Sequence, residues 1–447
     1  MTLADEAKGG DGAKSAPPLS GTGTETGIAS AFDELRTIGS PAQWRDAGPD
    51  DTVAGVQPRM VFEPQNEAEL AAALRVANAA GIGVIPRGSG SKDAWGNPPV
   101  RADLILSTAR LDRIIEHAWA DLTVSVEAGC TFATLQNTLA QHGQRIAVDP
   151  LWPEHGTVGG ILSTNDSGTL RIRYGGLRDL VIGVTIALPD GTLASSGGKV
   201  VKNVAGYDLP KLVTGAIGTL GIITRAVFRL HPLPHNIRTF TFAARDWADA
   251  NRLVLSVQDS KLAHTGLQVR HRSGEQPQVD IRFDGTEAGL AAQSHVLRKL
   301  ALPATETESN PEVWQARQRL FGLSAQNDRA FAIVKYSVLP GSIAATCDQL
   351  RDLSEPLNVG WETVVQGTGL GYIRFEASQP LPIHQVLPGM RARLEPGGSA
   401  VVLYRSPGIP EIDAWGDAGD AFPLMLKVKE QLDPKKTLNP GRFVGGI

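Results

Sequence analysis

The sequence is poor in cysteine and has no cluster of like charge. Its 447 residues include two cysteines, Cys130 and Cys347, which lie far apart. Two isolated cysteines make neither a disulfide framework nor a metal-ligand cluster, and such usage fits a reducing cytosol. The formal net charge is −4 and no basic tract is present. A nucleic-acid partner or an anionic membrane surface therefore has no support, because either needs clustered Lys and Arg.

Long apolar runs are also missing. No run approaches the about 20 residues that a membrane-spanning helix needs, and the N-terminus has no hydrophobic stretch of the signal-peptide type. We therefore expect a cytoplasmic protein, whose contact with the inner membrane, if any, is peripheral and made only through a partner. Hydrophobic residues make up 42% of the chain, enough for sizeable cores. This length suits two or three domains.

The pattern along the chain divides it into segments. Residues 1–30 are rich in Gly, Ala, Ser and Thr and are predicted to be disordered. Residues 58–233 alternate short strands and helices, whereas residues 236–410 begin a second α+β pattern. Residues 422–447 are predicted to form a helix followed by a Pro/Gly-rich tail. The sequence therefore predicts an α+β protein with two main domains and a separate C-terminal segment.

A first glycine-rich segment follows the strand predicted at residues 83–86. It reads Arg87-Gly88-Ser89-Gly90-Ser91. Small residues let consecutive backbone N–H groups converge on an anion, and the hydroxyls add donors. A phosphate or pyrophosphate is the expected ligand, although a plain turn has the same composition. The segment is neither the G-x-G-x-x-G of a nicotinamide site nor a P-loop.

Two more glycine-rich segments follow. Residues 153–168 place two glycine clusters around a short apolar pair and are predicted to be neither a regular helix nor a packed strand. Such a stretch suits a backbone that approaches a ligand closely, the alternative being a long surface loop. Residues 201–209 and 215–223 predict a tight turn before the strand at 222–230, which is also what an ordinary βα corner needs.

In this order the segments resemble the FAD-binding domain of the vanillyl-alcohol oxidase family, also called the cresol-hydroxylase type. The matching sequences are Pro-Arg-Gly-Ser-Gly-Ser at 86–91, Thr-Val-Gly-Gly at 157–160, Asn-Asp-Ser-Gly at 165–168, Leu-Pro-Asp-Gly at 188–191, Gly-Tyr-Asp-Leu through Gly-Thr-Leu-Gly-Ile-Ile-Thr at 206–224, and the ending at 432–442. The resemblance implies a two-subdomain FAD-binding domain at 58–233. It also implies a substrate or cap-type α+β domain at 236–410, and a tail at 422–447 that returns to complete the FAD site.

The resemblance also implies which residues hold FAD. They are Arg87, Gly88, Ser89, Gly90 and Ser91 at the pyrophosphate; Thr157, Gly159 and Gly160 beside the flavin and ribityl chain; Thr164, Asn165 and Gly168 at the phosphate end; Gly218 and Ile223 at the adenosine; and Asn439 in the returning tail. The alternative for each of them is a role in turn geometry alone.

The departures from the family pattern are equally informative. Relatives with covalent flavin carry a His in or next to the first glycine loop, where this chain has Ser91-Lys92, so FAD is expected to be non-covalent. Relatives that oxidise D-2-hydroxy acids carry metal-binding histidines in a glycine-rich run. The nearest counterpart, residues 367–371, has none, so no metal is expected. His155 lies in the FAD domain and is interpreted as a polar loop residue.

Basic residues of the second domain are the candidates for a carboxylate substrate. Arg317, Lys335 and Arg374 are the three proposed, because a bidentate Arg suits an α-hydroxy carboxylate. Most such residues are solvated surface charges, which is the alternative. The catalytic base is undetermined, and Tyr336, Tyr372 and His155 are the first residues to examine for it. No Ser-His-Asp set or paired carboxylates stand out.

Three classes of function remain. The first is a self-sufficient FAD-linked D-2-hydroxy-acid dehydrogenase, such as one for D-lactate. The second is the FAD-binding subunit of a glycolate oxidase complex, which the resemblance favours and which implies a homologous FAD-linked subunit and an iron–sulfur subunit as partners. The third is a non-catalytic FAD-binding assembly subunit or a non-redox nucleotide-binding module. Because an iron–sulfur cluster typically takes four thiolates, any such cluster must lie on another chain.

Overall fold

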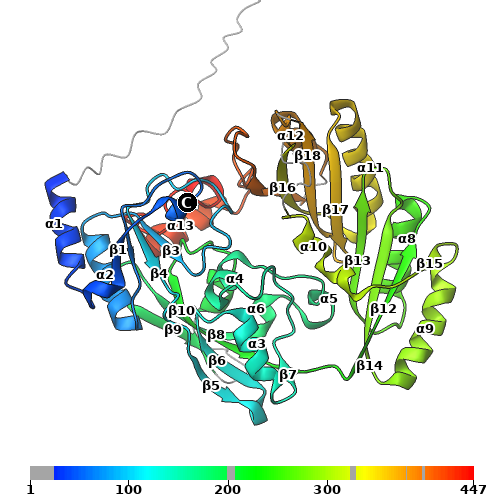
Figure 1. Ribbon diagram of the computed structural model, residues 1–447, viewed down its shortest axis with the longest axis horizontal. Coiled ribbons are helices and arrows are strands. Elements are labelled where there is room, and N and C mark those ends of the chain that lie inside the picture. The colour runs from blue at the N-terminus through cyan, green and yellow to red at the C-terminus, as the bar shows by residue number, and fades with distance from the viewer. Residues whose placement is uncertain (1–24, 199–206, 323–328, 379, 395–397) are drawn as a thin grey trace, which may run out of the picture.

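The computed structural model describes residues 25–198, 207–322, 329–378, 380–394 and 398–447. Over these ranges the chain forms two lobes, one holding both ends of the described chain and one built around a single large sheet (Figure 1). The predicted α+β class is confirmed. The domain ranges 58–233, 236–410 and 422–447 remain our proposal for how the chain divides.

The first lobe begins with a small mixed sheet. Its strands, in spatial order, are β1 (Trp44–Asp46), β2 (Met60–Phe62), β4 (Leu104–Ser107) and β3 (Val84–Arg87), and β4 runs parallel to both β2 and β3. Helices α1 (Glu25–Leu35) and α2 (Glu67–Ala79) lie beside it. The Asn66 side chain caps α2 by accepting from the Glu69 N–H, as is usual for Asn before a helix.

The N-terminal prediction of disorder over 1–30 falls mostly outside the described residues. Its end, residues 25–30, belongs to α1. Ala31, Phe32 and Leu35 of this helix are buried against α2 and the first sheet. Their spacing places them on one face of a helix. The composition of residues 1–30 alone did not reveal this helix.

A second sheet completes the first lobe. It is antiparallel, with strands in the order β5 (Ile114–Ala118), β6 (Thr123–Glu127), β10 (Ile222–Arg229), β8 (Val181–Ala187) and β9 (Leu193–Gly197). Its helices are α3 (Phe132–Ala140), α4 (Val158–Thr164), α5 (Arg171–Tyr174), α6 (Leu177–Leu180) and α7 (Leu209–Val213), and β7 (Gln144–Arg145) pairs with β11 (His231–Pro232). The core between this sheet and its helices is built from Val, Ile, Leu and Phe side chains.

The second lobe is one antiparallel sheet. Its strands lie in the order β15 (Thr305–Thr307), β12 (Asn236–Ala243), β14 (Gln278–Gly285), β13 (His264–Arg272), β17 (Gly360–Gln366), β18 (Leu370–Ser378), β16 (Arg329–Ser337) and β19 (Ser399–Arg405). Four helices cover its outer face: α8 (Trp247–Asp259), α9 (Glu287–Ala301), α11 (Ile343–Ser354) and α12 (Ile383–Arg393). The short α10 (Ala316–Arg319) packs near β17 and β18 instead, where Ala316 and Tyr372 share a small core with Leu151 of the first lobe.

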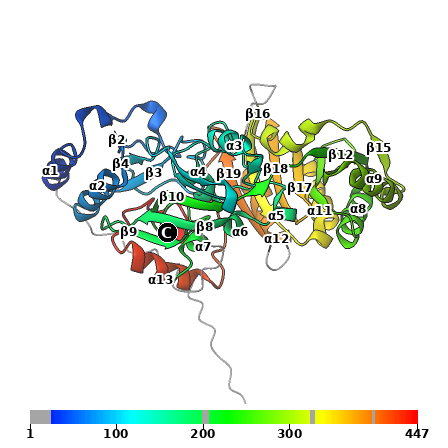
Figure 2. The ribbon, with the colours of Figure 1, turned by 90° about the horizontal axis from the view of Figure 1, so that it is seen from below.

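The C-terminal segment returns to the first lobe. Helix α13 (Phe422–Leu432) lies against it beside α7 (Figure 2). The tail after α13 then runs alongside β3: Val84 donates its N–H to Thr437 O at 2.8 Å, and Asn439 donates to Val84 O at 2.9 Å. The buried ammonium of Lys429 bonds Asp433 and the carbonyls of Thr219 and Leu438, which fastens the returning tail.

Short 3₁₀ turns connect several of these elements. They are η1 (Pro41–Gln43), η2 (Pro49–Asp51), η3 (Trp119–Asp121), η4 (Pro311–Gln315), η5 (Pro340–Ser342), η6 (Glu355–Leu357) and η7 (Val444–Gly446).

Candidate functional site

The first glycine loop and helix α4 form one side of a cleft in the first lobe. The loop leaves β3 at Arg87, and Gly90 adopts the left-handed conformation with φ of 78°. A Cβ on Gly88 would lie 2.2 Å from Thr157 Oγ1. Only a residue without a side chain lets the loop and the start of α4 approach this closely.

Helix α4 corrects the sequence analysis. Residues 158–164 are helical, although residues 153–168 were predicted to contain no regular helix. The Thr157 side chain caps the helix by accepting from the Gly160 N–H, and Ile161 and Leu162 are buried. Gly159 is required by packing, since a Cβ there would lie 2.9 Å from the Ala128 Cβ. The cap and this buried face offset the low helix propensity of two glycines.

Most of the predicted FAD residues line this one cleft. The predicted residues that line it are Arg87, Gly88, Ser89, Gly90, Ser91, Thr157, Gly159, Gly160, Thr164, Gly218, Ile223 and Asn439. Sequence reasoning missed Lys92, Asp93, Thr108, Ser163 and Arg442, which line it too. Arg442 stands in the Asn-Pro-Gly-Arg ending that the resemblance already covered, and Lys92 directly follows the glycine loop.

Two predicted residues lie elsewhere. Asn165 ends α4 in the left-handed conformation, with φ of 48°, and its side chain faces Gly215. Gly168 donates its N–H to Asp149 Oδ1 at 3.0 Å, and a Cβ on it would strike the same carboxylate. Gly168 lines a second cavity between the lobes. Their ligand roles stay predictions, and the contacts seen here shape the loop after α4.

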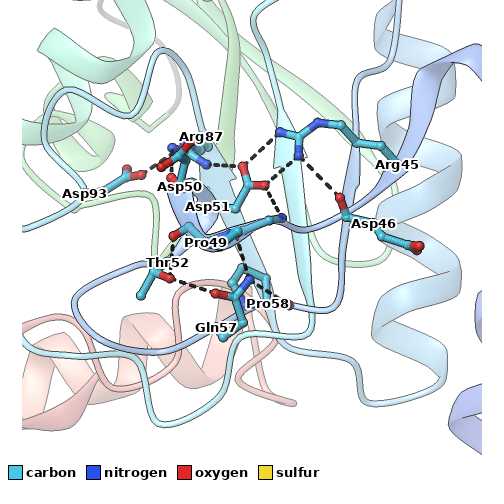
Figure 3. Close-up of polar contacts among 11 residues, drawn as sticks. Arg45, Asp46, Pro49, Asp50, Asp51, Thr52, Gln57, Pro58, Arg87 and Asp93 are labelled. Carbon is cyan, nitrogen blue, oxygen red and sulfur yellow. Dashed lines mark hydrogen bonds and ion pairs between the residues drawn. The ribbon is translucent and has the colours of Figure 1, made fainter.

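Arg87 is held by carboxylates rather than left free for a ligand (Figure 3). Its guanidinium lies 2.8 Å from Asp51 and 2.9 Å from Asp93. Asp51 also binds Arg45, and the hydrogen bond from Arg45 is the main cause that lowers the pKa of Asp51 to about 2. Because its charge is matched by Asp51 and Asp93, Arg87 fixes the loop. The backbone N–H groups and serine hydroxyls remain for an anion.

Lowering the pH is expected to weaken this anchor. The pKa of Asp51 in the folded chain lies below its ordinary 3.8. Its ion pairs therefore stabilise the fold fully above that ordinary value and lose their effect as the pH falls toward the folded-state pKa. The free energy of unfolding of the wild type should exceed that of Asp51→Asn at about pH 6, and the difference should shrink by about pH 3. Urea denaturation across this range measures the difference; one that stayed constant would contradict the assignment.

Buried polar atoms along the cleft fit a ligand with its own donors and acceptors. Asn439 donates from Nδ2 to Ile217 O at 2.6 Å, but its Oδ1 has no hydrogen-bond partner among the described residues. Arg442 Nε and Lys92 Nζ are also buried, and neither has a hydrogen-bond partner among the residues that the structure describes. Burial lowers the pKa of Arg442 to about 10, with Asp93 acting in the opposite direction. Since buried polar groups are normally paired, these atoms and the glycine cradle fit FAD.

A buried ionic network joins the two lobes next to this cleft. Arg317 of α10 donates to Asp166 Oδ1 at 2.7 Å and to the Asp149 carbonyl at 2.7 Å. Lys92 Nζ lies 3.3 Å from the other oxygen of Asp166. Burial alone would raise the pKa of Asp166, but Arg317 and Lys92 lower it below the ordinary value. Asp166 is therefore an anion that ties the glycine loop of the first lobe to α10 of the second.

The cavity between the lobes has a volume of about 830 Å³ and a lining that mixes apolar side chains, amides and four charged residues. Its amide side chains are Gln136, Asn137, Gln268, Gln315, Gln318 and Gln366. The two arginines in its described lining, Arg282 and Arg317, are paired with Asp284 and Asp166. Among the described residues, this lining offers the carboxylate of a substrate many amide groups, whereas both of its arginines are already paired.

The three predicted substrate residues are only partly brought together. Arg317 and Lys335 both lie near the ring of Tyr372, at 5.1 and 6.0 Å from its centroid. Arg374 turns away, donating to the carbonyls of Leu320 and Gly322 and pairing with Glu376. Their contact with substrate remains a prediction, and each of the two arginines already has carboxylate and carbonyl partners.

The candidate bases lie in different surroundings. Tyr336 is fully buried and its hydroxyl pairs with Thr363 at 3.0 Å; burial raises its pKa well above the ordinary value. The Tyr372 hydroxyl accepts from Arg317 at 3.2 Å. His155 is exposed. Among the described residues there is no group of three or more His, Cys, Asp or Glu able to hold a metal ion. The expectation of no metal remains a prediction.

The lobes and the cleft define an FAD-binding oxidoreductase of the vanillyl-alcohol oxidase type. A family model described as an FAD binding domain matches residues 58–197. The fold is similar to a solved alkyldihydroxyacetonephosphate synthase, with a TM-score of 0.72 at 18% identity over 93% of this chain and 86% of that one. Similarity at this identity supports the fold.

Sequence relatives extend the match to nearly the whole chain. The D-2-hydroxyglutarate dehydrogenase of Xanthomonas citri pv. viticola is 31% identical over 461 aligned positions, covering 93% of this chain and 96% of that protein. Glycolate oxidase subunit GlcD of Bacillus subtilis is 30% identical over 233 residues, and this alignment spans 52% of this chain and 49% of the relative. The chain therefore belongs to this family of FAD-dependent oxidoreductases, and FAD is its cofactor.

Acid denaturation is expected to release the flavin. The resemblance places covalent attachment at a His in or next to the first glycine loop, and Ser91 and Lys92 stand there instead. Neither side chain is a usual attachment point, so FAD should appear in the supernatant after acid precipitation of the protein. Yellow colour that stays with the precipitate would show a covalent bond.

Proposed function

We propose that this chain is the FAD-binding subunit of a glycolate oxidase complex, the subunit called GlcE. In this proposal it takes part in the oxidation of glycolate, or a related 2-hydroxy acid, to the 2-oxo acid. The bound FAD would supply the two-electron acceptor chemistry of such a reaction. The residues predicted to hold it are those of the cleft beside β3 and α4.

One observation carries the subunit role. Most of the residues predicted to hold FAD gather in one cleft, whereas the two arginines in the described lining of the cavity between the lobes are already paired, and the carboxylates in that lining, Asp149 and Glu154, would repel a substrate carboxylate. A hydroxy-acid substrate needs a free cationic group that binds its carboxylate. This contrast supports a chain that holds flavin and relies on a partner for substrate oxidation.

The cysteines support partners for electron transfer. Cys130 and Cys347 are both buried and unpaired, and burial raises the pKa of Cys130 to about 11. A thiol that stays protonated is a poor iron ligand. We propose a homologous FAD-linked subunit and an iron–sulfur subunit as the partners, with electrons leaving through the latter.

We also propose a cytoplasmic complex that touches the inner membrane only peripherally. Among the helices that the structure describes, none combines the length and apolar character needed to cross a bilayer.

A second candidate is a self-sufficient dehydrogenase for a D-2-hydroxy acid such as D-lactate or D-2-hydroxyglutarate. The alignment with the D-2-hydroxyglutarate dehydrogenase favours it, because that alignment covers 96% of the relative. In this candidate Arg317 and Lys335, which both lie near the ring of Tyr372, would receive the substrate. A non-catalytic FAD-binding assembly subunit is the third possibility.

Flavin reduction separates these candidates. The full chain is purified alone and with its co-purifying partners, and the flavin spectrum is recorded after addition of glycolate, D-lactate or D-2-hydroxyglutarate. We expect bleaching in the complex and none in the isolated chain within the turnover time. Rapid bleaching of the isolated chain would overturn the subunit role in favour of the dehydrogenase. If the complex keeps its activity when this chain cannot bind FAD, the assembly role holds.

A further inference from the structure

Lys92 is a buried cation of the FAD cleft that the FAD assignments leave without a role. Its side chain is 6% exposed, and its Nζ has no hydrogen-bond partner among the described residues. The rings of Trp95 and Trp152 lie 5.7 and 5.8 Å from Nζ. A buried ammonium with unfilled donor positions costs free energy unless a further acceptor reaches it.

The counter-charge of Lys92 is shared. Asp166 is its ion-pair partner at 3.3 Å, but the same carboxylate accepts from Arg317 at 2.7 Å and from the Leu151 N–H at 2.8 Å. Asp149 is the other carboxylate nearby, and it faces Arg317 while accepting from backbone amides. Asp166 therefore divides its charge between Lys92 and Arg317 and does not serve Lys92 alone.

The position of Lys92 along the cleft indicates which end of FAD it meets. Gly218 lies against Pro86 and Asn439, where the adenosine is predicted, and Gly88 lies against Thr157 in the middle. Lys92 comes directly after the glycine loop and lies against Trp152 and Asp166, where Asp166 meets Arg317 of the second lobe. Since the pyrophosphate separates the adenosine from the flavin, the flavin end belongs on the side of Lys92.

We propose that Lys92 presents its positive charge to the flavin end of the bound FAD and raises its reduction potential. Reduction adds negative charge to the ring system, and a cation held in a partly desolvated site stabilises the reduced form more than the oxidised form. Asp166 reduces this effect because its negative charge offsets part of the positive charge of Lys92. The inference rests on FAD binding alone and is independent of the glycolate oxidase assignment.

The test is the reduction potential of FAD in the purified full chain, measured by equilibration with a reference dye. In Lys92→Met the ratio of reduced to oxidised flavin at a given potential should fall at least about tenfold, or about 30 mV for a two-electron couple. Lys92→Arg keeps the charge and should stay close to the wild type. The matched control is Lys211→Met, since Lys211 is an exposed lysine of α7 that pairs with Asp208.

Asp166→Asn is expected to shift the reduction potential in the direction opposite to Lys92→Met. Removing the shared carboxylate frees the charge of Lys92, so the potential should rise, whereas general damage to the site would move both variants the same way. If Lys92→Met does not retain FAD, the direction in which the reduction potential of Asp166→Asn shifts decides the test. An unchanged potential in Lys92→Met, or a fall in Asp166→Asn, overturns the proposal. Because no hydroxy acid is used, failure here leaves the proposed function untouched.

Discussion

Replacing Gly159 with valine is expected to remove most FAD binding. A Cβ at this position would lie 2.9 Å from the Ala128 Cβ and 3.2 Å from the Ala128 carbonyl oxygen, so α4 must shift away from β6. Overpacking of this kind typically costs about 1–3 kcal/mol. If that strain falls on the cleft, the FAD dissociation constant should rise about 10- to 100-fold. The ratio of flavin to protein after gel filtration, and fluorescence titration with FAD, measure the effect.

The matched control is Gly341→Val. A Cβ on Gly341 meets nothing within 4 Å, and the residue lies in η5 of the second lobe. This variant should retain FAD like the wild type. Circular dichroism of both variants separates loss of the cofactor from loss of the fold. Wild-type FAD affinity in Gly159→Val would show that the start of α4 does not form the cofactor cradle.

Replacing Arg317 with leucine is expected to destabilise the protein by about 3–5 kcal/mol, the usual cost of removing one partner from a buried ion pair. Arg317 is 7% exposed and Asp166 is fully buried. The variant leaves Asp166 with Lys92 as its remaining cation, and the Asp149 carbonyl loses its donor. Urea denaturation at neutral pH measures the free energy of unfolding, and the loss of a contact between lobes should lower the midpoint.

Arg319→Leu, on the same helix, is the control. Arg319 pairs with Glu312, and both side chains are at least half exposed, at 50% and 65%. Exposed pairs contribute about 0–1 kcal/mol, so this change should be nearly neutral. Equal destabilisation by the two variants would mean that α10 stabilises the protein through packing. The ion pair with Asp166 would then contribute no more than the exposed pair.

The glycine segments show how far sequence reasoning reached. Gly88, Gly159 and Gly218 were assigned to FAD from their motifs, and the structure places all three on one cleft. The sequence could single them out because a backbone cradle needs small residues at particular positions, and such positions are visible in the sequence; their contact with FAD stays a prediction. The same reasoning missed α4. Glycine propensity argues against a helix, but the Thr157 cap and the close packing on Ala128 outweigh it.

The charged residues show where sequence reasoning no longer predicted the contacts. Arg317 and Arg374 were proposed for substrate because a guanidinium suits a carboxylate. In the structure their partners are Asp166 and Glu376, together with backbone carbonyls. Lys92 was noted only as a residue standing where a His was missing. The Arg317–Asp166 pair is not apparent in the sequence, since the two residues are 151 positions apart.

The sequence by itself therefore determined the α+β class and the glycine cradle, with FAD as its ligand. These depend on local backbone requirements and on the alternation of short apolar segments, and neighbouring residues specify both. Tertiary structure alone decided the pairing of Lys92, Asp166 and Arg317 and the gathering of amide side chains along the cavity between the lobes. An ion pair depends on which distant segments pack together and on how much water they exclude, and no local pattern encodes that.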